Sequence, residues 1–176
     1  MAKEKFKVLL VDDEKEFVES LSERLQLRNL DAEVVYDGEQ ALDALAHGSD
    51  PDVMVLDLRM PGVDGMEVLR RVRKTHPNMR VVILTGHGTD KDELEAKHLG
   101  AFDYLEKPVD IEHLDSTLRR AWRSLKQMKE RMDHAWMACA FSEAGQPDYA
   151  LKVMEELEKK ESQAQDKSDP LKMQRR

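Results

Sequence analysis

The chain has 176 residues, of which 40% are hydrophobic and 36% are charged, and its formal net charge is −8. This length suits one compact domain with an appendage, or two small domains. The acidic excess lies in residues 1–120, which have a formal net charge of −9, whereas residues 121–176 have a formal net charge of +1. Because neither part has the basic excess of a nucleic-acid footprint, we expect no direct contact with nucleic acid and no DNA-binding output domain.

A single cysteine, Cys139, excludes an intrachain disulfide and fits a reducing compartment. The apolar run near the N-terminus is short and already contains Asp12 and Asp13, unlike a signal peptide. No stretch approaches the roughly 20 apolar residues that a membrane span needs. We therefore expect a cytoplasmic protein without membrane insertion.

Three short apolar runs, 7–11, 53–56 and 80–84, are rich in β-branched residues and continuous rather than alternating. Such runs are typical of strands that are buried on both faces of a parallel sheet. Residues 32–36 and 102–106 are weaker strand candidates, and amphipathic helical patterns separate all five. The alternation predicts an α/β fold with a doubly wound, five-stranded parallel sheet.

The fifth helical pattern continues further than a sheet requires. Apolar residues recur with the 3-4 spacing of a coiled-coil seam, at Ile111, Leu114, Leu118, Ala121, Leu125, Met128, Met132, Ala135 and Cys139. Gly145-Gln-Pro147 ends this helix, and a second amphipathic pattern follows over residues 149–157. We divide the chain into a first domain at 1–120, a helical extension at 121–162 and a polar tail at 163–176 that we expect to be disordered.

Three interpretations of the extension remain open: a coiled-coil homodimer, an intramolecular helical hairpin, and a methionine-rich docking surface for another protein. The seam residues Leu118, Leu125, Met128 and Met132 are expected to lie beyond the reach of the first domain. Each of these side chains would stabilise the protein by about 1.5–3 kcal/mol if it were buried, and this stabilisation is lost if the side chain stays in water. This argument favours the dimer, and the hairpin is the main alternative.

Residues whose side chains can react or bind a ligand follow four of the five expected strands. Asp12 and Asp13 follow the first strand, Asp57 the third, Thr85 the fourth and Lys107 the fifth. Each has an ordinary interpretation when taken alone, such as a helix N-cap for an aspartate. In open α/β sheets, however, ligands bind at the carboxyl ends of the strands, where all five residues would converge.

The chemistry of that set is specific. Three neighbouring carboxylates repel one another unless a cation lies among them, and oxygen ligands suit Mg²⁺. Asp57 is the natural nucleophile, since carboxylates form aspartyl-phosphates. Lys107 and Thr85 can bind further phosphoryl oxygens, and phosphoryl transfer depends mainly on such positioning and charge neutralisation. The sequence therefore predicts phosphoryl transfer to Asp57.

Four segments resemble the receiver-domain family of response regulators in two-component signal transduction. They are Val11-Asp-Asp-Glu14, Val55-Leu-Asp-Leu-Arg-Met-Pro-Gly62 with Asp64-Gly65, Ile83-Leu-Thr-Gly86 and Tyr104-Leu-Glu-Lys-Pro108. The resemblance covers about residues 5–120. It implies a flavodoxin-like sheet of strand order 2-1-3-4-5, here with an extended fifth helix and a C-terminal helical hairpin.

The resemblance also implies roles for the acidic residues. Asp57 is the phosphoacceptor, and Asp12, Asp13 and Asp57 hold Mg²⁺ together with the backbone carbonyl of Arg59. Asp13 is the direct metal ligand of the acidic pair.

Further roles concern switching. Thr85 and Lys107 contact the phosphoryl group, Tyr104 rotates inward when Thr85 moves towards it, and Pro108 forms a cis peptide bond with Lys107. Gly86 leaves the acceptor accessible. We expect the Lys107 ammonium to be solvated, so that its removal costs little stability.

These inferences predict a response regulator that a sensor histidine kinase phosphorylates on Asp57 and that signals to an unknown downstream protein through protein–protein contacts. It is not a turnover enzyme, because it catalyses only its own phosphorylation and dephosphorylation. The alternative is a phosphate sink or phosphorelay intermediate. An elaborate extension favours the switch.

Overall fold

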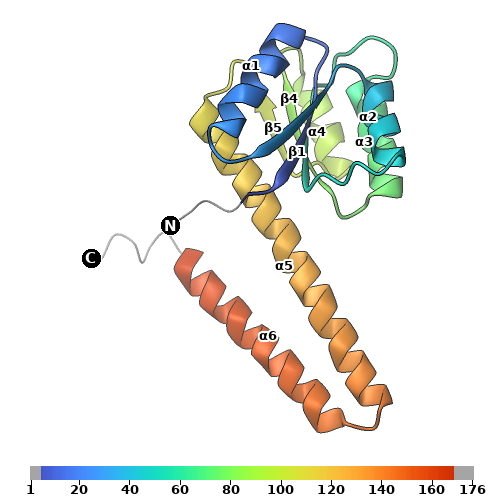
Figure 1. Ribbon diagram of the computed structural model, residues 1–176, viewed down its shortest axis with the longest axis vertical. Helices are drawn as coiled ribbons and strands as arrows, with labels where there is room; N and C mark the ends of the chain where they lie inside the picture. Colours follow the sequence, from blue (N-terminus) through green and yellow to red (C-terminus); the bar gives the residue numbers. More distant parts are fainter. Residues whose placement is uncertain (1–4, 169–176) are drawn as a thin grey trace, which may run out of the picture. The chain divides into compact units, whose positions relative to one another are not determined.

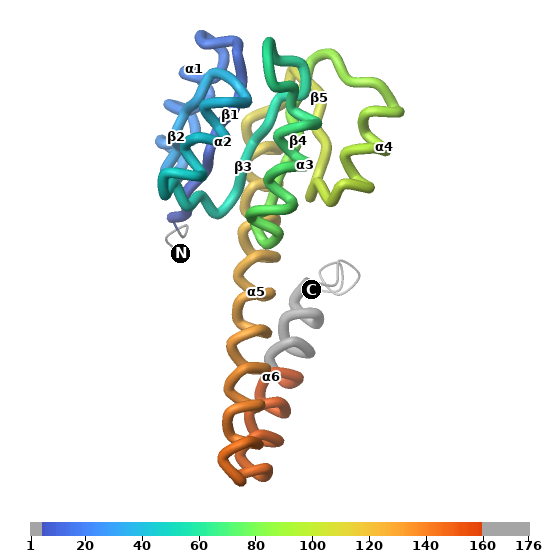
Figure 2. The backbone as a smooth tube through the Cα atoms, turned by 90° about the vertical axis from the view of Figure 1, so that its right-hand side faces the viewer, coloured from blue at the N-terminus to red at the C-terminus, as the bar shows by residue number. Residues whose placement is uncertain are grey.

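The computed structural model describes residues 5–168, with side chains up to residue 159. Five strands form one parallel sheet in the order β2-β1-β3-β4-β5, which confirms the predicted topology. Figure 2 shows the strands side by side in this order. The elements of the sheet domain are β1 (Lys7–Val11), α1 (Lys15–Gln26), β2 (Asp31–Val35), α2 (Gly38–Ala46), β3 (Val53–Leu56), α3 (Gly65–Thr75), β4 (Arg80–Thr85), α4 (Asp90–His98), β5 (Asp103–Glu106) and the first part of α5 (Ile111–Glu143).

Helices cover both faces of the sheet (Figure 1). Because successive side chains of a strand point to opposite faces, Leu9 and Leu10 of β1 belong to two different cores. α1 and α5 pack over one face, and α2, α3 and α4 pack over the other. The continuous apolar runs in the sequence follow from this double burial.

The first part of α5 belongs to the sheet domain. Leu118 and Ala121 are fully buried in the core beside α1, and Leu125 is only 3% exposed. The rings of Phe6 and Trp122 stack with centroids 5.2 Å apart. The expectation that Leu118 and Leu125 lie beyond the reach of the first domain is therefore wrong. The compact unit that contains the sheet extends to Leu125 instead of ending at residue 120.

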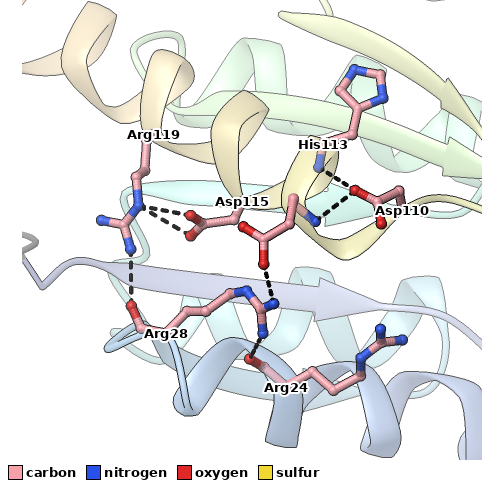
Figure 3. A network of polar contacts seen from close by, with 7 residues as sticks. Arg24, Arg28, Asp110, His113, Asp115 and Arg119 are labelled. Carbon is pink, nitrogen blue, oxygen red and sulfur yellow. Dashed lines mark hydrogen bonds and ion pairs between the residues drawn. The ribbon is translucent and has the colours of Figure 1, made fainter.

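A polar network fastens the start of α5 to the end of α1 (Figure 3). Arg119 Nε donates to both carboxylate oxygens of Asp115, at 3.0 and 3.1 Å, and its Nη2 donates to the Arg28 carbonyl at 2.9 Å. The Arg28 guanidinium pairs with Glu112 and donates to the Arg24 carbonyl. Since Asp115 is buried, it requires a charged partner. Arg119 meets that requirement and connects the two helices at the same time.

Residues 126–168 form a second unit, which consists of the rest of α5 and of α6 (Pro147–Ser168). A tight turn joins the two helices (Figure 1). Gly145 adopts a φ of 75° there, and the Gln146 amide donates to the Phe141 carbonyl at 2.9 Å. The rings of Phe141 and Tyr149 meet across the turn, with centroids 4.9 Å apart. The predicted C-terminal helical hairpin is confirmed.

The helical extension is longer than the sequence indicated. α6 continues to Ser168, so the disorder expected from residue 163 is wrong for residues 163–168. The remainder of that predicted tail, 169–176, lies outside the described residues. Within residues 5–168, none of the helices combines the length and the apolar character that crossing a membrane would demand.

Shortening a side chain should change the free energy of unfolding differently in the two halves of the apolar seam. Leu118→Ala removes a fully buried side chain and should lower the free energy of unfolding by about 2–5 kcal/mol. Met132 is 46% exposed in the single chain, so in protein dilute enough to be monomeric Met132→Ala should change it by less than about 0.5 kcal/mol. Urea unfolding followed by circular dichroism measures both. Equal losses in the two variants would contradict this division of the seam.

Candidate functional site

The register of the sheet brings the predicted residues to one edge. The last residues of β1 and β3 pair with each other, as do the last residues of β4 and β5. Asp12 and Asp57 directly follow the first pair, and the Asp57 amide donates to the Val11 carbonyl at 2.9 Å. At the second pair, the Lys107 amide donates to the Thr85 carbonyl at 2.9 Å. Parallel pairing therefore places these side chains at the same end of the sheet.

Asp12, Asp13 and Asp57 form an acidic cluster, in which one carboxylate oxygen of each lies within 4.8 Å of the others. Asp12 and Asp57 are buried, whereas Asp13 is partly exposed. Burial raises the pKa of Asp12, and hydrogen bonds from Lys107 and the Glu14 amide oppose that rise. Three oxygen donors at this spacing, with an excess of negative charge, fit a hard divalent cation such as Mg²⁺.

Lys107 neutralises part of this charge. Its Nζ lies 2.7 Å from Asp12 Oδ2, 2.7 Å from Glu14 Oε1 and 3.9 Å from Asp57 Oδ2. The Phe17 ring lies 4.4 Å below the ammonium, and the lysine side chain is only 11% exposed. Burial alone would lower the pKa of Lys107, but the hydrogen bonds to the two carboxylates outweigh burial and raise it. The expectation of a solvated ammonium is therefore wrong.

Glu14 and Phe17 are parts of the site that the sequence did not identify. The hydrogen bond from Lys107 lowers the pKa of the Glu14 carboxyl. Glu14 adjoins the acidic pair, but nothing in the sequence indicates that it meets a lysine 93 residues away. The Lys107–Pro108 peptide bond is cis, as the resemblance implied.

Thr85 and Tyr104 meet at Gly88. The Thr85 side chain is buried, and the Tyr104 ring points inward, with a buried hydroxyl that has no hydrogen-bond partner among the described residues. Burial raises the pKa of this hydroxyl. A Cβ at Gly88 would lie 1.6 Å from Tyr104 Oη and 2.9 Å from Thr85 Cγ2, so only glycine leaves room for the ring. At Gly86 a Cβ would make only ordinary contacts, 3.7 Å from Lys107.

The loop after β3 holds the Asp57 carboxylate in place. Asp57 Oδ1 accepts from the Leu58 amide at 2.7 Å and, more weakly, from the Arg59 amide at 3.4 Å. Gly65 starts α3 so close to this strand end that a Cβ there would lie 2.1 Å from the Asp57 carbonyl oxygen. The Arg59 carbonyl remains a predicted metal ligand. The Arg59 guanidinium contacts Asp92, a residue that the sequence did not single out.

The structure thus brings Asp12, Asp13, Asp57 and Lys107 into one cluster. Thr85 ends the neighbouring strand, and Tyr104 reaches the same loop from β5. The fold is therefore a parallel β-sheet flanked by helices, and the carboxyl ends of its strands carry an acidic cluster that contains one lysine.

Comparison with known proteins identifies the class to which this fold and site belong. A model of the response regulator receiver domain family matches residues 8–119. The chain is 34% identical over 137 residues to response regulator MprA of Mycobacterium avium, which covers 78% of this chain and 58% of MprA. It is 39% identical over 114 residues to the C4-dicarboxylate transport transcriptional regulatory protein DctD of Pseudomonas aeruginosa, covering 65% of this chain and 24% of DctD. The chain belongs to the response regulator receiver domain family.

Solved structures agree with this assignment. A response regulator receiver domain protein from Clostridium thermocellum is 31% identical, with a TM-score of 0.67 over 70% of this chain and 98% of that one. NtrX from Brucella abortus is 29% identical, with a TM-score of 0.69 over 74% of this chain and 30% of that one. The match to the C. thermocellum chain is nearly full-length for that protein, whereas the chain spans little more than half of MprA.

Removal of Lys107 should destabilise the sheet domain. Lys107→Ala leaves the buried Asp12 carboxylate without its cation, so at neutral pH and without divalent cations the free energy of unfolding should fall by about 3 kcal/mol. The pKa of Asp12, already raised by burial, should rise further in this variant. Folded Asp12 then takes up a proton more readily than unfolded Asp12, so the loss should shrink as the pH falls from 8 towards 5.

Urea unfolding in the presence of a chelator, at several pH values, tests this expectation. Glu14→Gln is the matched control: the Glu14 side chain is 63% exposed, so loss of its ion pair should cost less than about 1 kcal/mol. Wild-type stability in Lys107→Ala would show that the ammonium is dispensable for the fold.

Proposed function

We propose that Asp57 accepts a phosphoryl group from a sensor histidine kinase in the cytoplasm, and that this phosphorylation switches contacts with a downstream protein. The observation that supports the proposal is the setting of the Asp57 carboxylate. It is buried, lies 3.9 Å from the Lys107 ammonium and shares an acidic cluster with Asp12 and Asp13. Membership of the receiver family agrees with it.

The two oxygens of Asp57 have different tasks in this proposal. Oδ1 is held by the Leu58 and Arg59 amides, whereas Oδ2 faces Lys107. Oδ2 is therefore the nucleophile that forms the new bond to phosphorus, while the bond between phosphorus and the donor breaks and its electron pair leaves with the donor. For a histidine kinase, the leaving group is the imidazole of the donor phosphohistidine.

The remaining residues neutralise charge and position the phosphoryl group. Asp12, Asp13 and Asp57, with the Arg59 carbonyl, would hold Mg²⁺, which when bound supplies positive charge for phosphoryl oxygens. The Lys107 ammonium and the Thr85 hydroxyl bind the other oxygens. To do so, Lys107 exchanges one of its carboxylate partners for the phosphoryl group, and the exposed Glu14 is the partner that is easiest to release.

We infer that the chain acts as an enzyme only on itself. Water attacks phosphorus and forms a new O–P bond, the bond from phosphorus to Asp57 breaks with its electron pair returning to the carboxylate, and inorganic phosphate leaves. The alternative function is a phosphate sink or phosphorelay intermediate. A switch keeps its phosphoryl group long enough to be recognised, whereas a sink loses it quickly, so the lifetime of the phosphorylated chain distinguishes the two. The structured hairpin supports the switch.

Phosphorylation should occur at Asp57 alone and should require Mg²⁺. With acetyl phosphate and Mg²⁺, intact-mass analysis should show one added phosphoryl group, which Asp57→Asn or a chelator should abolish. Asp13→Ala should weaken Mg²⁺ binding in a calorimetric titration and nearly abolish labelling. Asp64→Asn is the matched control, because the Asp64 carboxylate caps α3 and lies outside the acidic cluster. Full labelling of Asp57→Asn would refute the assignment.

We further propose that the hairpin pairs two copies of the chain. Six of its large apolar side chains are 39–75% exposed: Met132, Trp136, Met137, Tyr149, Leu151 and Met154. Only Leu27 and Leu94 are comparably exposed elsewhere in the described residues. An exposed apolar surface of this kind usually has a partner. The proposal replaces the longer seam expected from the sequence, since that seam up to Leu125 is buried in the sheet domain.

Charged substitutions in the hairpin should separate the copies. Met132→Glu combined with Trp136→Glu should convert a dimer to a monomer in light scattering and leave labelling at Asp57 intact. Gln127→Glu combined with Lys129→Glu adds negative charge at exposed polar positions of the same helix and should leave the dimer unchanged. If the wild-type chain is monomeric at every accessible concentration, the pairing proposal fails.

A further inference from the structure

α4 is the most weakly packed helix of the sheet domain. Ala96 is its only buried side chain, and Leu94 is 60% exposed. α4 therefore buries a single methyl side chain, whereas α3 buries Val68, Leu69 and Val72. The position of α4 therefore depends unusually strongly on polar contacts, and such elements move most readily.

Two ion pairs hold α4 from outside. Arg70 of α3 pairs with Glu95 in the middle of the helix. Arg59, from the loop after β3, pairs with Asp92 in the first turn, where Nη2 lies 2.8 Å from Oδ2. Asp92 also forms a capping box with Thr89: Asp92 Oδ2 accepts from the Thr89 amide at 3.0 Å, and Thr89 Oγ1 accepts from the Asp92 amide at 3.2 Å.

Arg59 connects α4 to the phosphoacceptor. Its amide lies 3.4 Å from Asp57 Oδ1, and its Nε lies 3.4 Å from the His87 carbonyl oxygen. One residue therefore contacts the Asp57 carboxylate, the loop after β4 and the first turn of α4. By contrast, the Arg70–Glu95 pair joins two helices and has no contact with Asp57 among the described residues.

Arg59 can leave Asp92 without leaving a buried charge unpaired. The Arg59 side chain is 55% exposed, so its guanidinium can turn without leaving a buried position. Asp92 is 19% exposed and retains its hydrogen bonds from Thr89 when Arg59 leaves, so no unpaired carboxylate results. The same Thr89 bonds lower the pKa of Asp92 and so favour its charged form.

We infer that Arg59 and Asp92 form a latch that holds the first turn of α4 to the phosphoacceptor loop, and that a phosphoryl group on Asp57 opens the latch by attracting the Arg59 guanidinium. This inference rests on the proposed phosphorylation of Asp57. A phosphoryl group carries roughly −1.5 to −2 charge, and each of its oxygens has lone pairs beyond those that Mg²⁺, Lys107 and Thr85 would use. It also offers the oxygen geometry that guanidinium groups bind in a bidentate manner.

Opening the latch would also affect the surroundings of Tyr104. The loop between Thr85 and α4 contains His87, whose carbonyl Arg59 contacts, and Gly88, against which the Tyr104 hydroxyl lies. Release of Arg59 loosens this loop and changes the room available to Tyr104. The latch would thus link the charge on Asp57 to the exposed surface of α4 and β5.

Hydrogen exchange of the full chain tests the latch. Beryllium fluoride with Mg²⁺ serves as the phosphoryl analogue, and amides of residues 87–95 are followed. At rest, Asp92→Asn should exchange about threefold faster than wild type, the change expected for loss of a partly exposed ion pair. Loading should raise the wild-type rate to a similar level, and loading Asp92→Asn should add little further change.

Glu95→Gln is the matched control, because it removes the other ion pair of α4. It should raise the resting rate but still respond fully to loading. Arg59→Gln removes the other partner of the same ion pair, so without the phosphoryl analogue it should speed exchange as Asp92→Asn does. Arg59→Lys should partly restore slow exchange. Wild-type resting rates in Asp92→Asn, or a full response of that variant to loading, would overturn the latch.

Intact-mass analysis of the same preparation with acetyl phosphate separates this inference from the proposed function. If wild type acquires no phosphoryl group, the proposed function fails and opening by phosphorylation fails with it. The resting comparison of wild type, Asp92→Asn and Glu95→Gln still decides whether the ion pair holds α4. If wild type is labelled but loading leaves exchange at residues 87–95 unchanged, only the latch fails.

Discussion

The ion pair between Lys107 and Asp12 is the interaction on which the rest of the site depends. Lys107 follows β5 at the edge of the sheet, Asp12 follows β1, and both β3 and β4 lie between those strands. A buried carboxylate without a cation is strongly unfavourable. The requirement to neutralise Asp12 therefore ties the carboxyl end of β5 to that of β1, and it holds an ammonium close to Asp57.

The site combines groups that do not favour one another. Asp12, Asp13 and Asp57 repel, and burial penalises the charge of Asp12. Sites that bind ions and activated groups are commonly arranged in this way, because the ligand supplies the missing charge. Gly65 and Gly88 have a related role, since each removes a side chain where backbone or ring must approach the site closely. A side chain at either position would clash with these neighbours.

Much of the fold was predictable because double burial leaves continuous apolar runs, and the observed strands differ from the predicted ones by about a residue. The convergence of Asp12, Asp57 and Lys107 followed from parallel pairing alone. The partners of charged side chains did not, because the Lys107–Glu14 and Arg59–Asp92 pairs depend on loop geometry between distant residues. The extent of the seam was misjudged for another reason: a 3-4 spacing is shared by a helix packed on a sheet and a coiled coil.

The stacking of Trp122 on Phe6 has an optical consequence. The chain contains two tryptophans, and the other, Trp136, lies in the hairpin with 75% of its surface exposed. Trp122 is partly buried against the core, and an indole in such a setting emits at shorter wavelengths than one in water and is reached less readily by a quencher dissolved in the solvent. In the unpaired chain, the intrinsic fluorescence of one unlabelled preparation therefore contains two separable signals, one from the sheet domain and one from the helical hairpin.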